Sequence, residues 1–208
     1  DPTPPTIPQV DLTVAGEMVG AYTLFNHLEK GRDPNRQKLL IVDPEGEVRF
    51  HYDLPYKASG DIDVRFLSGG RILYGGGYGG RPHIIDLGGN LLFRGSATPS
   101  GGRYHHHVEP GPGESELFSL VTSQNAADGH SFTGFATELL AMETNEILWS
   151  WDSQVAIDRG VLSPGAGDPF HANWMGVAEE DDGDRLWINM RNNHKFCRIF
   201  MDTGEVEW

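Results

Sequence analysis

Residues 40–50 read LIVDPEGEVRF: an apolar run, an acidic residue with a glycine close behind it, and a second apolar ending. Three later stretches, 83–93, 139–149 and 198–208, repeat this pattern, and 139–149 alone among them lacks the glycine. Short strands joined by tight turns and repeated at such a period are typical of β-propeller blades. The sequence therefore predicts an all-β propeller with four-stranded antiparallel blades. The acidic turn residues are Asp43, Asp86, Glu143 and Asp202, which lie 43, 57 and 59 positions apart.

We interpret the chain as one propeller preceded by a proline-rich arm, because proline cannot donate a hydrogen bond inside a sheet. A ring needs its last blade to pack on its first, since both would otherwise keep exposed strand edges. Four blades or blade parts either close an unusually small ring or belong to a larger one, whose other blades are missing or come from another chain; we favour the second. The expected ranges are 1–19 for the arm and 20–54, 61–94, 105–151 and 171–208 for the blades.

Composition excludes several classes of partner. The formal net charge of −14 argues against nucleic acid and anionic membranes, which require a basic face. No stretch approaches the about 20 apolar residues of a membrane span. A single cysteine, Cys197, excludes an internal disulfide framework, and its strand-like surroundings favour a buried structural thiol. The start Asp1-Pro2 resembles a terminus left by signal-peptide removal, so we expect a secreted or periplasmic protein.

Histidines recur at matching places in the repeat frame. His105 and His171 fall at equivalent positions of two blades, and His107 and Asn173 follow two residues later on the same face. The inner strand of each blade lines a propeller's channel, so these residues should converge there. Imidazole serves as base, nucleophile or anion ligand, and the guanidinium of Arg191 suits a tetrahedral oxyanion. This pattern is typical of a site for acyl, phosphoryl or sulfuryl transfer.

Other interpretations of the same residues stay open at this point. A run of histidines also occurs in surface loops, His171 can be a packed core residue, and Arg191 can be solvated. Zinc held by His105, His107 and His171 is a further alternative. His106 is left out of it because neighbouring residues of a regular strand point to opposite faces. We expect no metal and no cofactor.

At these residues the chain resembles the bacterial arylsulfotransferase family, over Ala21 to Trp208. The resemblance is sharpest at 105–108 (HHHV), 168–173 (DPFHAN) and 189–193 (NMRNN). The family shows a His-His-Asp strand, an Asp-x-x-His-x-Asn segment and an Arg-Asn pair at comparable spacing. The resemblance implies a secreted or periplasmic propeller of about six blades. It also implies sulfuryl transfer from a phenolic sulfate ester to a phenol through a sulfated histidine, without a soluble carrier.

Carried over residue by residue, the resemblance implies that His105 or His106, His171 and Arg191 bind and polarise the sulfate. His107 and Asn173 would contact the substrate. Two departures matter. His107 stands where the family has aspartate, and no residue matches the nucleophilic histidine that the family places C-terminal to the arginine. We therefore expect this chain alone to lack the nucleophile.

Two other functions compete with this one. The first is a non-catalytic propeller that acts as a binding or assembly subunit, because the fold does not determine function. The second is a histidine-dependent polysaccharide lyase, which a tyrosine at channel depth, such as Tyr104, would favour. Under the favoured interpretation the partner is a small aromatic or sulfated substrate.

Overall fold

The computed structural model describes residues 22–28, 37–55, 62–76, 80–113 and 115–207. The predicted arm, 1–19, lies outside this range. The regular secondary structure of the described residues is almost entirely antiparallel sheet, with one short α-helix and one 3-10 turn. No helix in it is long and apolar enough to cross a membrane.

The first two sheets are formed by consecutive strands. The first sheet has the order β1-β2-β3 and the second the order β4-β5-β6-β7, with the 3-10 turn Ser68–Gly70 between β4 and β5. The strands are β1 (Thr23–Leu28), β2 (Gln37–Val42), β3 (Val48–Asp53), β4 (Asp63–Leu67), β5 (Arg71–Gly76), β6 (Gly80–Asp86) and β7 (Leu91–Arg94).

The last two sheets continue this arrangement. The third has the order β11-β10-β9-β8 and the fourth the order β12-β13-β14, and α1 (Ser153–Asp158) lies between them in sequence. The strands are β8 (Tyr104–Pro110), β9 (Glu116–Ala127), β10 (His130–Ala141), β11 (Ile147–Asp152), β12 (Ala172–Ala178), β13 (Arg185–Met190) and β14 (Lys195–Phe200).

The repeated sequence pattern forms the outer hairpin of each sheet. Its turns need a left-handed residue, and Gly46, Gly89 and Gly204 supply it with φ of 86°, 79° and 68°. In the repeat without glycine, Asn145 takes this place with φ of 57°, because asparagine tolerates the left-handed region. The turn carboxylate also binds the backbone: Asp43 accepts from the N–H groups of Glu45 and Glu47.

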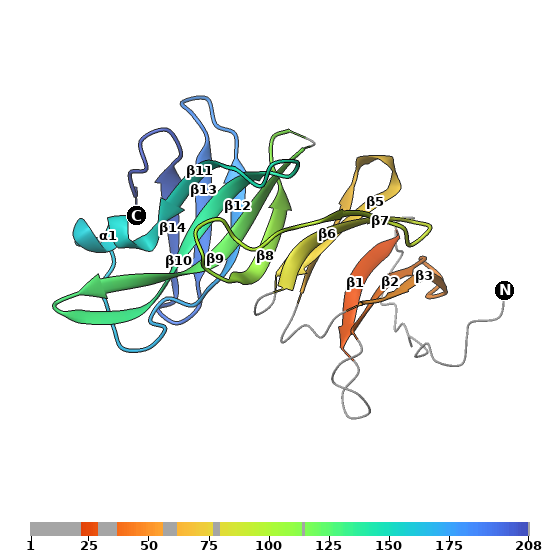
Figure 1. Ribbon diagram of the computed structural model, residues 1–208, viewed down its shortest axis with the longest axis horizontal. Coiled ribbons are helices and arrows are strands. Elements are labelled where there is room, and N and C mark those ends of the chain that lie inside the picture. Colours follow the sequence, from red (N-terminus) through yellow and green to blue (C-terminus); the bar gives the residue numbers. More distant parts are fainter. Residues whose placement is uncertain (1–21, 29–36, 56–61, 77–79, 114, 208) are drawn as a thin grey trace.

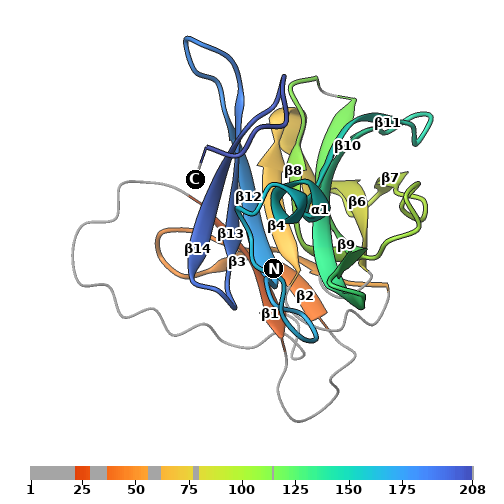
Figure 2. The ribbon, with the colours of Figure 1, turned by 90° about the vertical axis from the view of Figure 1, so that its left-hand side faces the viewer.

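The sheets pack face to face in chain order. The second and third sheets meet around Leu73, Ile84, Val108 and Leu117, which are all buried. A larger cluster, which includes Phe118, Trp151 and Phe170, joins the third sheet to the fourth. The first and fourth sheets stand at opposite ends of the molecule (Figure 1). Figure 2 looks onto the end formed by the fourth sheet, where α1 lies between β12–β14 and β8–β11.

The all-β prediction is confirmed, and the four sheets are consistent with blades of an incomplete propeller. The strands β1, β4, β8 and β12 are the first of their sheets, and β4 contacts β1 and β8 while β8 contacts β12. They therefore take the place of inner strands. The prediction of four strands per blade holds for two sheets. The first and fourth have three described strands, and the fourth adds only a bridge between Ile199 and Val206.

Candidate functional site

The three consecutive histidines lie in a bulge of β8. Tyr104 pairs with Val121 and Val108 pairs with Ser119, so β8 takes four residue steps where β9 takes two. The extra residues lift the backbone out of the ladder, and His106 adopts a left-handed φ of 53°. The bulge therefore breaks the alternation of a regular strand.

The rings of His105, His106 and His171 form one cluster, which we call the histidine cluster. The Nε2 atoms of His106 and His171 are 3.1 Å apart. The ring centroid of His105 lies 4.2 Å from that of His106 and 5.0 Å from that of His171. One ring nitrogen from each histidine falls within 4.8 Å of the others. His105 and His171 are buried, and His106 is partly exposed.

Two of these rings are oriented by oxygen atoms on their Nδ1 side. Asp168 Oδ2 lies 2.5 Å from His171 Nδ1, and the other carboxylate oxygen accepts from the backbone N–H of His171 at 2.9 Å. The carbonyl oxygen of Ala172 lies 2.9 Å from His105 Nδ1. A carbonyl oxygen only accepts hydrogen bonds, so His105 carries a proton on Nδ1. In the neutral ring its Nε2 then carries the lone pair.

Asn173 lies two residues after His171, and Arg191 directly follows β13, which pairs with β12. The N–H of Arg191 donates to the His171 carbonyl at 3.2 Å, while its exposed side chain donates to Asn192 Oδ1 at 3.2 Å. Asn192 donates in turn to the Asp168 carbonyl at 2.8 Å. Asn173 sits in a second bulge, between the pairs of Ala172 and Trp174. Its Oδ1 is buried without a hydrogen-bond partner among the described residues.

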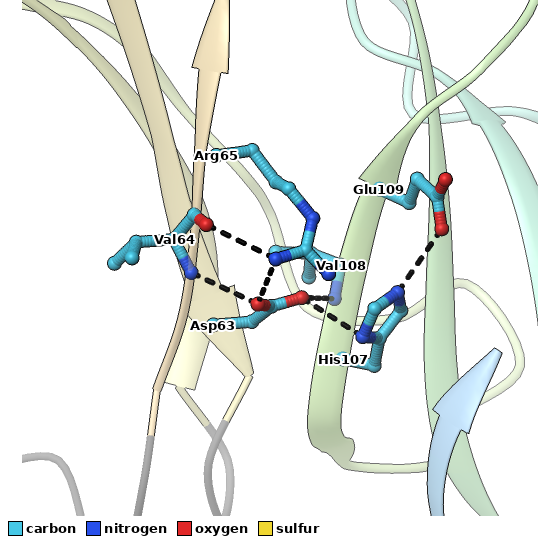
Figure 3. Close-up of polar contacts among 6 residues, drawn as sticks. All are labelled: Asp63, Val64, Arg65, His107, Val108 and Glu109. Atoms are coloured by element: carbon cyan, nitrogen blue, oxygen red, sulfur yellow. Dashed lines mark hydrogen bonds and ion pairs between the residues drawn. The ribbon is translucent and has the colours of Figure 1, made fainter. Parts of the chain in front are cut away.

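His107 belongs to a different network, which joins β8 to β4 (Figure 3). Its Nδ1 lies 2.9 Å from Asp63 Oδ2 and its Nε2 lies 3.1 Å from Glu109 Oε2. Asp63 also accepts from Arg65 at 2.7 Å. Burial acts to lower the pKa of His107, but hydrogen bonds to Asp63 and Glu109 and the charge of Asp63 outweigh it and leave the pKa raised. His107 therefore connects β8 to β4 through its contact with Asp63, and the raised pKa favours the protonated ring.

A polar cavity of about 730 Å³ opens beside the histidine cluster. His105 and Asp168 lie at its boundary, and Arg103 provides a cationic group. The described lining residues include no Phe, Tyr or Trp, and the uncharged polar ones are Ser100, Thr122, Ser123, Gln124 and Thr133. Asp152 is a second carboxylate in the lining, beside Asp168. Such a cavity suits a hydroxyl-rich ligand more than a purely apolar one.

Burial sets the protonation of the remaining candidate groups. It lowers the pKa of His105 to about 4, with the charge of His106 adding to the effect, so His105 is neutral at pH 7. Burial and the nearby Glu138 raise the pKa of Tyr104 to about 12, which gives no support to a lyase base there. Burial also raises the pKa of the Cys197 thiol to about 11, as a structural cysteine requires.

The structure corrects one part of the sequence reasoning. Strand alternation grouped His105 with His107 and excluded His106, but the bulge brings His105 and His106 together and turns His107 toward Asp63. A zinc site made of His105, His107 and His171 is therefore wrong. Asp168 was not predicted as a site residue, although its spacing of three from His171 was a signal for it.

Comparison with known sequences supports the assignment of this chain. A search of curated proteins found no match. A family model described as arylsulfotransferase (ASST) matches residues 9–208, which include every residue of the histidine cluster. The match covers nearly the whole sequence, and this chain therefore belongs to the arylsulfotransferase family.

Proposed function

We propose that the histidine cluster binds the sulfuryl group of a phenolic sulfate ester for transfer to a phenol. The observation that carries the proposal is the convergence of three imidazoles from two sheets beside a cavity with a cationic lining residue. Hydrogen-bond donors aimed at a sulfate stabilise the charge that grows on its oxygens during transfer. Family membership supports this chemistry.

The side chains take distinct parts in this proposal. Asp168 orients His171 so that its Nε2 faces His106, and the hydrogen bond between these two Nε2 atoms holds a proton. That proton can pass to the phenolate oxygen when the S–O bond breaks. Arg103, which lines the cavity, supplies a further donor toward the sulfate oxygens, and the cavity beside His105 receives the rest of the substrate.

Transfer by double displacement accounts for the family chemistry. A histidine nitrogen forms a bond to sulfur while the bond from sulfur to the phenolic oxygen breaks. The hydroxyl oxygen of the acceptor phenol then attacks sulfur, releases the histidine and gives up its proton. A secreted or periplasmic location fits this proposal, because no soluble carrier is required.

Binding of 4-nitrophenyl sulfate, followed by calorimetry, tests the proposal. We expect saturable binding that inorganic sulfate competes away and that His171→Asn weakens at least tenfold. The matched control is His130→Asn, an exposed histidine on the hairpin of β9 and β10, which should bind as the wild type does. Absence of saturable binding, or equal binding by His171→Asn, would overturn the proposal.

Release of 4-nitrophenol in the presence of phenol tests transfer itself. We expect this chain alone to lack the nucleophilic histidine, so binding without turnover is the predicted result. Turnover that requires His171 but survives His194→Asn would instead assign the nucleophile to the cluster. Release of 4-nitrophenol that does not depend on phenol would replace transfer by hydrolysis.

A further inference from the structure

We propose that the histidine cluster is also a binding site for a divalent transition-metal ion of the zinc class. Three imidazole nitrogens are its ligands, and one coordination position is left open. The inference goes beyond sulfuryl transfer, because it concerns a second kind of ligand for the same three rings.

The spacing of the rings fits such an ion. Zinc bound by imidazole at about 2.0–2.1 Å in tetrahedral geometry places its ligand nitrogens about 3.3 Å apart. His106 Nε2 and His171 Nε2 are 3.1 Å apart, which is already this separation. All three possible donor atoms lie within 4.8 Å of one another. Small ring movements, without a backbone rearrangement, therefore complete the ligand set.

The groups behind the rings match those of zinc sites. A metal-bound histidine usually donates a hydrogen bond from its other ring nitrogen to a carboxylate or a backbone carbonyl. This bond fixes the tautomer and the ring plane. Asp168 takes this place behind His171, and the Ala172 carbonyl takes it behind His105. Two of the three rings are therefore oriented from behind before any ion binds.

The donor set selects the type of ion. Imidazole nitrogen suits zinc, copper, nickel and cobalt, whereas magnesium and calcium require oxygen ligands. Asp168 supplies a nearby negative charge that favours a cation. The histidines come from β8 and from the segment that precedes β12, so a bound ion would connect the third and fourth sheets. Zinc should consequently raise the melting temperature, whereas magnesium should not.

Calorimetry with zinc chloride on the chelator-treated chain tests the proposal. We expect one ion per chain, and at least a tenfold larger Kd in each of His105→Asn, His106→Asn and His171→Asn. Asparagine is chosen because it tolerates the left-handed backbone of His106 and His171. Asp168→Asn should weaken binding by about 10–100-fold, as for other groups that orient a ligand. The exposed His130→Asn is the matched control and should bind as the wild type does.

The visible spectrum of the cobalt-loaded wild type tests the geometry without any variant. Four-coordinate Co²⁺ gives intense bands and six-coordinate Co²⁺ gives weak ones, so we expect the intense bands. Weak bands, or equal zinc affinity in the wild type and the three asparagine variants, would overturn the metal site. None of these solutions contains a sulfate ester. Zinc binding without binding of 4-nitrophenyl sulfate would therefore contradict only the proposed function, and the reverse result would contradict only the metal site.

Discussion

His105 and His107 are two residues apart in β8 and have opposite electrostatic surroundings. His105 is buried beside two other imidazoles, and its pKa is lowered to about 4. His107 is equally buried but lies between Asp63 and Glu109, and its pKa is raised. The pKa values of these two histidines of one strand are therefore shifted in opposite directions by their surroundings.

The charge on His107 should make stability depend on pH. Its pKa is raised above the unfolded value of about 6.5, so its contribution is complete below that pH and is lost as pH rises through the folded pKa. We expect the free energy of unfolding of the wild type to fall over the range from about pH 6 upward, as the pH passes about 6.5 and then the higher folded pKa. His107→Gln should be less stable at pH 6 and should show a smaller fall. Urea unfolding across this range measures the fall. An equal dependence of the free energy of unfolding on pH in both proteins would contradict the role given to His107.

His105 should act in the opposite direction. Its folded pKa is lowered, so its contribution is complete above about pH 6.5 and is lost as pH falls toward 4, because only the unfolded chain takes up the proton. The free energy of unfolding should fall by up to about 3 kcal/mol, at about 1.4 kcal/mol for each pH unit by which the pKa is lowered. His105→Asn should lose less stability than the wild type between pH 6.5 and pH 4. A larger acid loss in the variant would rule out this role.

The sequence predicts which residues form the site better than it predicts the directions in which their side chains point. His105 and His171 do meet, as their places in the repeat frame indicate. The alternation of side chains that placed His105 and His106 on opposite faces holds only for a regular strand. Nothing in the sequence HHHV indicates that one of its residues adopts a left-handed φ. Contacts across sheets, such as that between His107 and Asp63, depend on packing between segments far apart in the chain.

At the scale of the elements, the position of β8 depends on a close contact between Gly102, just before the strand begins, and the backbone of Thr122. A Cβ atom added to Gly102 would lie 2.2 Å from the Thr122 carbonyl oxygen, which is a backbone atom and cannot move aside cheaply. The strand that carries the histidines is therefore positioned by a residue that must lack a side chain.

Gly102→Ala should consequently destabilise the protein by about 1–3 kcal/mol, the usual cost of overpacking. It should also weaken binding of 4-nitrophenyl sulfate, because β8 is displaced. The matched control is Gly101→Asn: Gly101 has open space and a φ of 79° that asparagine tolerates. Urea unfolding and calorimetry on both variants measure the effects. A Gly102→Ala protein as stable as the control would show that β8 does not need this approach.

At the scale of the whole molecule, two tryptophans fasten the third sheet to the fourth. Trp149 Nε1 donates to the Met201 carbonyl at 2.8 Å, and Trp151 Nε1 donates to the Gly204 carbonyl at 3.1 Å. The acceptors belong to the last outer turn. The repeat pattern thus forms the hairpin to which the tryptophans of the preceding sheet bind.

Two substitutions at Trp151 separate the hydrogen bond from the packing of the ring. Trp151→Phe should cost about 1 kcal/mol, the net value of one hydrogen bond. Trp151→Ala should cost about 3–5 kcal/mol, because the side chain is buried in the largest core cluster and leaves a cavity. Thermal and urea unfolding measure both. Equal losses in the two variants would show that the hydrogen bond carries the whole effect.

The fold could be predicted from sequence where local chemistry repeats. Each acidic turn with its left-handed residue marks one outer hairpin, so the number of sheets and their order follow from the pattern. The helix α1 falls between two expected blades and is not predicted, because its six residues are too few to show a period. Only its cap, where Asp152 accepts from the Gln154 N–H, signals a helix start.

The backbone of the histidine cluster has a consequence for how this chain would evolve under selection. His106 and His171 hold bulky side chains at φ of 53° and 46°, which costs about 1–2 kcal/mol per residue. A library randomised at both positions and screened only for heat resistance should therefore enrich glycine and asparagine over histidine. Retention of histidine in that screen would mean that the rings themselves hold the fold together. Enrichment of glycine would mean that the two histidines lower the thermal stability of the chain. Selection for stability alone would then replace the histidines of the cluster before other residues.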